Sequence, residues 1–154
     1  MEKLLEKKTA IITGAANGVG QIISQKFSEE GANLILADMD ESNLKKEADL
    51  IRKSGSHVEI FCGDLRQNLT IKNLLALSTK TFKNIDILVN ASRQVTISHP
   101  LHSEDMFFEE LMSQNVGVNL KLSREVAKKM IAQNISRPDS GNAIGSIVNL
   151  SSIA

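Results

Sequence analysis

The sequence predicts an α/β fold, with a doubly wound parallel sheet between two layers of helices. Short apolar segments rich in β-branched residues alternate with longer segments whose apolar residues recur at helical spacing. Turns rich in glycine or polar residues separate the two kinds of segment. Strands that alternate with helices at this rhythm pair in parallel through right-handed crossovers, so helices cover both faces of the sheet.

The first strand–turn–helix unit begins at residue 9. Residues 9–13 are apolar or β-branched and predict a buried strand that stops at Gly14. A helix follows, because apolar residues recur at helical spacing, namely Val19, Ile22, Ile23 and Phe27. Gly31 is typical of the residue that ends a helix.

Two further units repeat this order. Residues 33–37 predict a second strand ending at Asp38, and Ser42 predicts the start of a helix that ends near Gly55. Residues 57–62 predict a third strand, in which Cys62 is expected to be a small buried residue. The spacing of apolar residues predicts the third helix, which contains Ile71, Leu74, Leu75, Ser78 and Phe82.

The second half of the chain predicts two more strands and one long helix. Residues 85–89 form the fourth predicted strand, and Ser103 precedes two acidic residues at the start of a helix over about 104–133. Residues 136–142 are dense in helix breakers and predict a surface loop, and residues 146–150 predict a fifth strand.

The long predicted helix carries two apolar stripes, Leu111, Val118, Leu122 and Val126 in the first and Met112, Val116, Ala127 and Met130 in the second. Packing against one face of a sheet requires a single stripe. We therefore expect the second stripe to face a partner subunit, so that the protein forms a homo-oligomer through this helix.

The composition excludes several classes of function. The chain has 154 residues, 42% of them hydrophobic and 23% charged, which is typical of one globular domain over 1–154. Lys and Arg (18) balance Asp and Glu (18), so no overall positive field attracts nucleic acid or a membrane surface. A single cysteine cannot form an internal disulfide, and the first residues show no apolar signal segment. A cytoplasmic protein without nucleic-acid or membrane partners is expected.

The first turn contains three glycines between a predicted strand and a predicted helix. Gly14 permits a tight turn, Gly18 lets backbone N–H groups approach a pyrophosphate, and Gly20 lets the helix pack close to the strand. The helix N-terminus supplies the positive end of a dipole. A phosphate-binding loop of an NTPase is a poorer match, because this turn contains no Lys.

Asp38 stands 18 residues after Gly20, at the end of the second predicted strand. A carboxylate at this position accepts hydrogen bonds from an adenosine ribose and repels a 2′-phosphate, which favours NAD over NADP. The alternative is that Asp38 only caps a loop.

These motifs resemble the short-chain dehydrogenases/reductases, whose pattern Thr-Gly-x-x-x-Gly-x-Gly matches residues 13–20 at every fixed position. The resemblance implies a Rossmann-like three-layer α/β/α domain. Asp64-Leu65 looks like the family's adenine-contacting pair, and Asn90 looks like the first residue of its Asn-Asn-Ala-Gly motif, of which the rest differs here. The residues that would hold the cofactor are Thr13, Gly14, Asn17, Gly18, Val19, Gly20, Asp38, Asp64, Leu65 and Asn90.

The same resemblance implies a hydride transfer between nicotinamide and an alcohol or ketone substrate. Asn115 is similar to the family's catalytic Asn, whose backbone carbonyl holds a water in a proton relay, although it could equally be a hydrogen-bonded core residue. Ser152 takes the position of the catalytic Ser. The alternative is that this residue only belongs to the turn that ends the strand. The family's Tyr-x-x-x-Lys is missing, because the sequence contains no Tyr and stops at Ala154. We therefore expect a domain truncated after its fifth strand and inactive by itself.

One alternative function remains beside this interpretation. The absence of Tyr is also typical of a short dinucleotide-binding protein that acts as a sensor or scaffold without catalysis. His99 and His102 are close in sequence, but no third ligand stands nearby, so no metal site is predicted.

Overall fold

The computed structural model of the chain describes residues 3–97, 101, 105–136 and 144–151. Its centre is a parallel sheet of five strands in the order β3-β2-β1-β4-β5. The strands are β1 (Thr9–Thr13), β2 (Asn33–Asp38), β3 (Val58–Cys62), β4 (Ile87–Asn90) and β5 (Ser146–Asn149). The helices are α1 (Gly18–Glu29), α2 (Glu41–Lys53), α3 (Asn68–Phe82), α4 (Asp105–Met112), the π-helix η1 (Ser113–Gly117) and α5 (Val118–Ile135).

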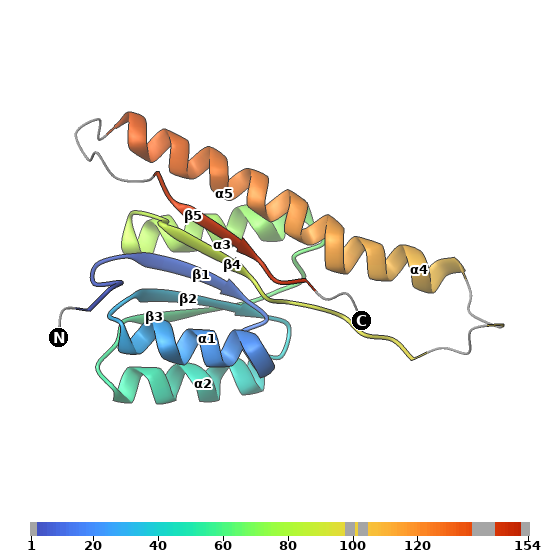
Figure 1. Ribbon diagram of the computed structural model, residues 1–154, viewed down its shortest axis with the longest axis horizontal. Helices are drawn as coiled ribbons and strands as arrows, with labels where there is room; N and C mark the ends of the chain where they lie inside the picture. The colour runs from blue at the N-terminus through green and yellow to red at the C-terminus, as the bar shows by residue number, and fades with distance from the viewer. Residues whose placement is uncertain (1–2, 98–100, 102–104, 137–143, 152–154) are drawn as a thin grey trace.

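Helices cover both faces of the sheet, which confirms the predicted three-layer α/β/α class (Figure 1). Alternate residues of each strand point to opposite faces. Ile11, Ile35 and Leu88 therefore belong to the core beneath α3 and α5, whereas Ile12 and Leu36 belong to the core beneath α1 and α2.

The sheet has a switch point between β1 and β4. The chain proceeds outward from β1 to β2 and β3, then returns to add β4 and β5 on the other side of β1. Ligands of such sheets bind at the carboxyl ends of the strands beside this point. Thr13 and Asn90, the last residues of β1 and β4, lie opposite each other there.

Helix α1 approaches the sheet through small residues. Gly20, Ser24 and Ser28 are buried, and Ile23 and Phe27 pack against the core. Val19 and Ile22 were expected to share the apolar face, but they are 57% and 65% exposed. The expectation was wrong for these two residues, because close contact between helix and sheet favours small side chains over bulky ones on the contacting face.

Cys62 is exposed, so its predicted burial is wrong. It ends β3, the outer strand on its side of the sheet, which within the described residues pairs with β2 alone. Its thiol lies 3.5 Å from the carbonyl oxygen of Met39, in the segment that follows β2.

The long helix predicted over 104–133 is interrupted by the π-helix η1. In η1 the N–H of Val118 donates to the carbonyl of Ser113, five residues earlier. Val118, Leu122, Val126 and Met130 recur every four residues along α5 and are all buried in the core. The assignment of Met130 to the second stripe was therefore wrong, whereas Met112 and Val116 of that stripe are exposed.

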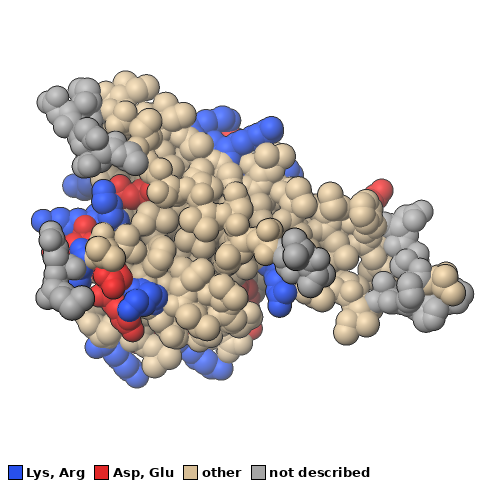
Figure 2. Space-filling view, viewed as in Figure 1, with Lys and Arg blue, Asp and Glu red and all other residues tan. Residues whose placement is uncertain are grey.

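Helix α4 projects beyond the carboxyl ends of the strands (Figure 1). Charged side chains gather at the opposite end of the molecule, where the strands begin, and are sparser at the α4 end in the view of Figure 2. Among the residues that the structure describes, no helix has the length and apolar character needed to cross a membrane.

Candidate functional site

The glycine loop between β1 and α1 forms the floor of the candidate site. Gly14 and Gly18 have φ angles of +67° and +56°, a region that favours glycine. A Cβ on Gly14 would lie 2.8 Å from the backbone of Ser92, so the loop packs directly on the segment that follows β4. A Cβ on Gly20 would collide with the carbonyl oxygen of Gly14, which is the close packing expected of the third glycine.

The N-terminus of α1 is arranged to receive an anion. Asn17, the N-cap residue, makes no capping hydrogen bond through its side chain, and the first turn contains no acidic residue. The N–H groups of this turn therefore keep their positive partial charge for a ligand. A Cβ on Gly18 would meet nothing within 4 Å, so the space above the helix end is open to a phosphate group.

The carboxylate of Asp38 lies beside this loop and accepts three backbone hydrogen bonds. Its Oδ2 accepts from the N–H of Ala16 at 3.0 Å. Its Oδ1 accepts from the N–H groups of Met39 at 2.7 Å and Asp40 at 3.1 Å. Asp38 thus braces the glycine loop and the turn after β2. This is the capping role that the sequence left as an alternative. Its carboxylate also lies where the ribose is predicted.

The loop after β3 carries an ion-pair network. Arg66 donates through Nε to both oxygens of Asp64, each at 3.0 Å, and through Nη2 to its Oδ2 at 2.8 Å. It also reaches Glu110 of α4 at 3.3 Å. Hydrogen bonding from Arg66 lowers the pKa of Asp64, against a smaller opposing effect of burial. Leu65 is buried in the core. Asp64 is therefore ionised and held in one orientation at this edge of the site.

The segment after β4 is fixed by the side chain of Thr13. Its Oγ1 accepts from the N–H groups of Ala91 and Ser92, each at 3.2 Å, and lies 3.3 Å from the Ser92 hydroxyl. The fully buried Asn90 donates to the hydroxyl of Ser123 at 3.0 Å and to Oδ1 of Asn149 at 2.8 Å. Asn90 thereby joins β4 to α5 and β5.

Asn115 lies in the π-helix and pairs with the segment after β4. Its Oδ1 accepts from the N–H of Gln94 at 2.7 Å, and its Nδ2 donates to the carbonyl of Gln94 at 2.9 Å. The backbone carbonyl of Asn115 accepts from Nδ2 of Asn119 at 2.9 Å. The side chain of Asn115 is therefore structural, and its carbonyl belongs to a polar group at the wide turn.

The predicted residues Thr13, Gly14, Asp38 and Asn90 meet at the carboxyl ends of the central strands, and Asn115 joins them through Gln94. Ser152, His99 and His102 lie outside the described residues. Sequence reasoning missed Arg66, Ser92, Gln94 and Asn119. Two of these had a local signal, since Arg66 stands two residues after Asp64 and Asn119 stands one helical turn after Asn115.

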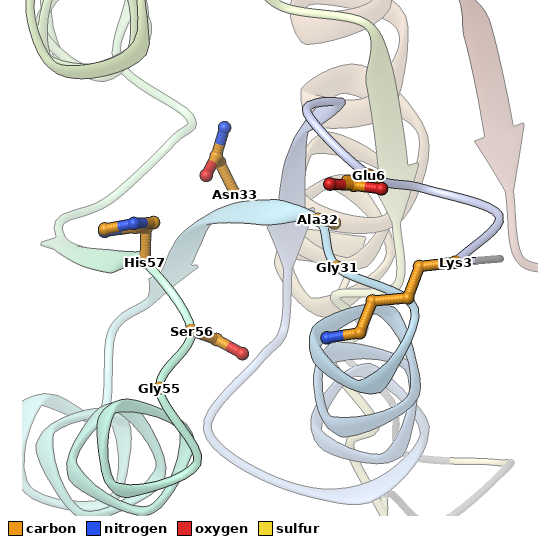
Figure 3. A pocket seen from close by; sticks show the side chains of 8 residues that line it. All are labelled: Lys3, Glu6, Gly31, Ala32, Asn33, Gly55, Ser56 and His57. Carbon is orange, nitrogen blue, oxygen red and sulfur yellow. The ribbon is translucent and has the colours of Figure 1, made fainter. Parts of the chain in front are cut away.

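A cavity of about 430 Å³ lies at the other end of the sheet (Figure 3). It is bordered by the N-terminal segment and by the turns that precede β2 and β3, with Lys3, Gly31 and Ser56 among its lining residues. It opens where the strands begin, so it is separate from the glycine loop.

Groups of three or more His, Cys, Asp or Glu side chains that could bind a metal ion are absent from the described part of the chain. The polar groups at the glycine loop include the N–H donors at the start of α1 and the carboxylate of Asp38, which suit a nucleotide better than a cation.

Comparison with known proteins identifies relatives over almost the whole chain. A family model described as short chain dehydrogenase matches residues 8–154. Oxidoreductase UcpA of Salmonella typhimurium is 34% identical over 149 residues, which are 97% of this chain and 53% of that protein. The chain spans about half the length of the curated relatives it matches.

Solved structures show the same arrangement of strands and helices. A short chain dehydrogenase/reductase from Burkholderia phymatum in complex with NAD has a TM-score of 0.87 and 26% identity, over 99% of this chain and 51% of that one. L-Sorbose reductase from Gluconobacter frateurii, complexed with NADPH and L-sorbose, has a TM-score of 0.86 and 23% identity, over 99% of this chain and 55% of that one. At that identity the second likeness shows the fold alone.

Proposed function

The chain belongs to the short-chain dehydrogenase family, and from this premise we propose that it is the cofactor-binding part of an NAD-dependent oxidoreductase acting on an alcohol or ketone. The observation that carries the proposal is the uncapped N-terminus of α1, which faces open space at Gly18 beside the carboxylate of Asp38. Free N–H donors next to a single negative charge match the pyrophosphate and ribose of a dinucleotide.

The preference for NAD over NADP rests on Asp38. Its carboxylate has oxygen lone pairs left after the three backbone N–H bonds, and these would accept from the ribose hydroxyls. A 2′-phosphate at the same place would meet this negative charge at short range. Both kinds of nucleotide occur among the structural relatives, one crystallised with NAD and another with NADPH.

The remaining cofactor-binding residues would act through their positions at the loop. Thr13 holds the backbone at residues 91 and 92 against the glycine loop, so the two walls of the site keep a fixed distance. Asp64, ionised and held by Arg66, offers acceptor oxygens to an adenine amino group. Bound nicotinamide would supply the hydride chemistry, which these side chains do not provide themselves.

The proposed catalytic residues of this chain are Asn115 and Ser152. Ser152 would donate a hydrogen bond to the reacting oxygen of the substrate, and the Asn115 carbonyl would hold a water that passes a proton. A phenol that exchanges this proton has to come from outside the 154 residues, because they contain no Tyr. We therefore expect no turnover from the chain alone.

A non-catalytic dinucleotide-binding sensor or scaffold is the second candidate, because the site at the glycine loop and Asp38 would serve it equally. The two candidates share the nucleotide site and differ in whether a proton donor completes it. In either case we propose a cytoplasmic protein that self-associates through the exposed stripe of the long helix, at Met112 and Val116.

Titration calorimetry of the purified protein, with any natural continuation beyond Ala154, against NAD⁺ and NADP⁺ tests the cofactor site. Binding of NAD⁺ that is tighter than that of NADP⁺ supports the proposal, and no heat at millimolar NAD⁺ would remove both candidates. Reading the coding sequence beyond codon 154 separates them. A Tyr-x-x-x-Lys soon after Ala154 supports the enzyme, and a stop codon supports the sensor or scaffold.

A further inference from the structure

The residue that precedes α1 is an asparagine followed by a glycine. Asn17 is exposed, and its side-chain amide makes no hydrogen bond with any described residue. Gly18 comes next, whereas every other asparagine of the chain precedes Leu, Ile, Val or Ala. Because glycine has no Cβ, no side chain on the next residue crowds the peptide nitrogen that adjoins the amide of Asn17.

The space around that peptide nitrogen is open as well. The N–H of Gly18 donates to no group of the described residues, in contrast to the N–H of Ala16, which the carboxylate of Asp38 holds at 3.0 Å. A Cβ built on Gly18 would meet nothing within 4 Å. The nitrogen can therefore approach the side chain of Asn17 without losing a hydrogen bond to the protein.

We propose that Asn17 is a deamidation site. The peptide nitrogen of Gly18, once it has lost its proton, attacks the side-chain carbonyl carbon of Asn17 and closes a five-membered succinimide ring. The bond from this carbon to the amide nitrogen breaks, and the amide nitrogen takes up one proton and leaves as ammonia. One water from the solvent then opens the ring at either carbonyl. The product is aspartate at position 17, or isoaspartate, in which the chain continues through the former side chain.

Both products place a negative charge at the N-terminus of α1. A carboxylate there is a favourable helix cap, so we expect the fold to persist. The same charge repels a phosphate group that approaches the N–H groups of the first turn. This consequence rests on the proposed function, in which the N-terminus of α1 binds the pyrophosphate. Deamidation would then cap the helix end with the protein's own carboxylate and lower the affinity for NAD⁺.

A bound dinucleotide would in turn protect Asn17. Its phosphate would accept a hydrogen bond from the N–H of Gly18, and a charge-assisted bond of this kind opposes loss of the proton and rotation of the peptide. Nucleotide binding and deamidation at this position therefore exclude each other, and the unliganded protein is the form that is modified.

The experiment follows each asparagine of the purified protein during incubation in neutral buffer. Trypsin yields a peptide over 9–26, in which Asn17 is the single asparagine. Mass spectrometry should show that Asn17 is converted about tenfold or more faster than Asn43. Asn43 is the matched control, because it is also exposed, but its amide donates to Asp40 at 2.8 Å and Leu44 follows it. An intact Asn17, or conversion no faster than that of Asn43, would overturn the proposal.

Calorimetry with NAD⁺ on fresh and incubated samples tests the consequence of the modification. The converted protein should bind NAD⁺ about tenfold or more weakly, and Asn17→Asp should show a similar loss without incubation. Asn17→Ser cannot deamidate, so its NAD⁺ affinity, whatever the starting value, should stay constant through the incubation. Equal affinity before and after complete conversion would overturn the proposed effect on the nucleotide site.

Protection by ligands separates this inference from the proposed function. Saturating NAD⁺ should slow the conversion of Asn17, whereas adenosine, which has no phosphate, should not. Equal protection by both would contradict a phosphate at the N–H of Gly18. No heat of NAD⁺ binding from the fresh protein would count against the proposed function, while the mass of the peptide over 9–26 would still decide whether Asn17 deamidates.

Discussion

The N–H of Ala16 donates a 3.0 Å hydrogen bond to the carboxylate of Asp38, which joins the glycine loop after β1 to the end of β2. One acid therefore has two tasks, bracing the loop and setting the charge at the predicted ribose position. The two tasks respond differently to substitution, so they can be measured separately.

Asp38→Asn should separate bracing from cofactor choice. The variant keeps one acceptor oxygen and loses the charge, so we expect the free energy of unfolding to fall by about 1–2 kcal/mol. If the carboxylate also repels a 2′-phosphate, the ratio of NADP⁺ to NAD⁺ affinity should rise by about tenfold, which corresponds to about 1.4 kcal/mol. Calorimetric titrations with both nucleotides, together with urea unfolding, give the two quantities.

Asp40→Asn is the matched control for that experiment. Asp40 caps α2 by accepting from the N–H of Asn43 at 3.0 Å, two residues from Asp38. Its substitution should change stability by less than about 1 kcal/mol, since Asn is also a good N-cap residue, and should leave the nucleotide ratio unchanged. Equal weakening of both nucleotides in Asp38→Asn would show that Asp38 only braces the loop.

The three loop glycines should differ in what their substitution damages. Gly20→Ala places a methyl group against the carbonyl oxygen of Gly14, so we expect a loss of about 3 kcal/mol or more in unfolding free energy. Gly18→Ala meets open space, and its positive φ of +56° should cost only about 1–2 kcal/mol. Its methyl group would, however, occupy the space predicted for the pyrophosphate, so NAD⁺ affinity should fall by about tenfold or more.

Gly55→Ala controls for the backbone strain. Gly55 also has a positive φ, +88°, and also has open space around its Cβ position, but it lies in the turn before β3 at the other end of the sheet. The Gly55→Ala variant should lose as much unfolding free energy as Gly18→Ala, and its NAD⁺ affinity should stay unchanged. If both variants bind NAD⁺ equally well, the phosphate position assigned to Gly18 is wrong.

Periodicity predicted the fold class because each strand alternates between two cores, as at Ile11 and Ile12. What it missed depends on contacts between distant segments. The π-helix accompanies the pairing of Asn115 with Gln94, 21 residues earlier, which no helical pattern contains. Cys62 is exposed at the end of β3, an outer strand in which Val58 is still buried, and strand order is a tertiary property. The glycine loop could be predicted from the sequence, because its conformation depends on local backbone geometry.

The pair of Asp64 and Arg66 should make stability depend on pH in the acid range. Arg66 lowers the pKa of Asp64 below its ordinary value of 3.8. A lowered folded-state pKa gives stability that is fully present above the unfolded value and is lost as the pH falls through the folded value. We therefore expect Arg66→Met to raise the pKa of Asp64 toward its ordinary value and to weaken the dependence of unfolding free energy on pH below about 4.

At neutral pH the same substitution should cost about 0.5–1 kcal/mol, because the two side chains are 33% and 21% exposed and water screens the pair. The carboxyl carbon of Asp64, followed by NMR between pH 2 and about 6, reports the titration directly. Arg52→Met removes the exposed pair with Asp49 and serves as the control, with no change in the Asp64 titration. An unaltered Asp64 titration in Arg66→Met would show that Arg66 is not what lowers the pKa of Asp64.

Val116→Lys should weaken self-association if the exposed stripe of the long helix is the subunit interface. Met112 and Val116 are 45% and 51% exposed on this stripe, and burying a lysine ammonium there would be unfavourable. We expect the dissociation constant from sedimentation velocity to rise by about tenfold or more, while unfolding free energy of the monomer changes by less than about 0.5 kcal/mol. Leu50→Lys, at a residue 56% exposed on α2, should leave association unchanged. A chain that sediments as a monomer at every concentration would show that there is no subunit contact. An equal effect of both variants would place the contact elsewhere.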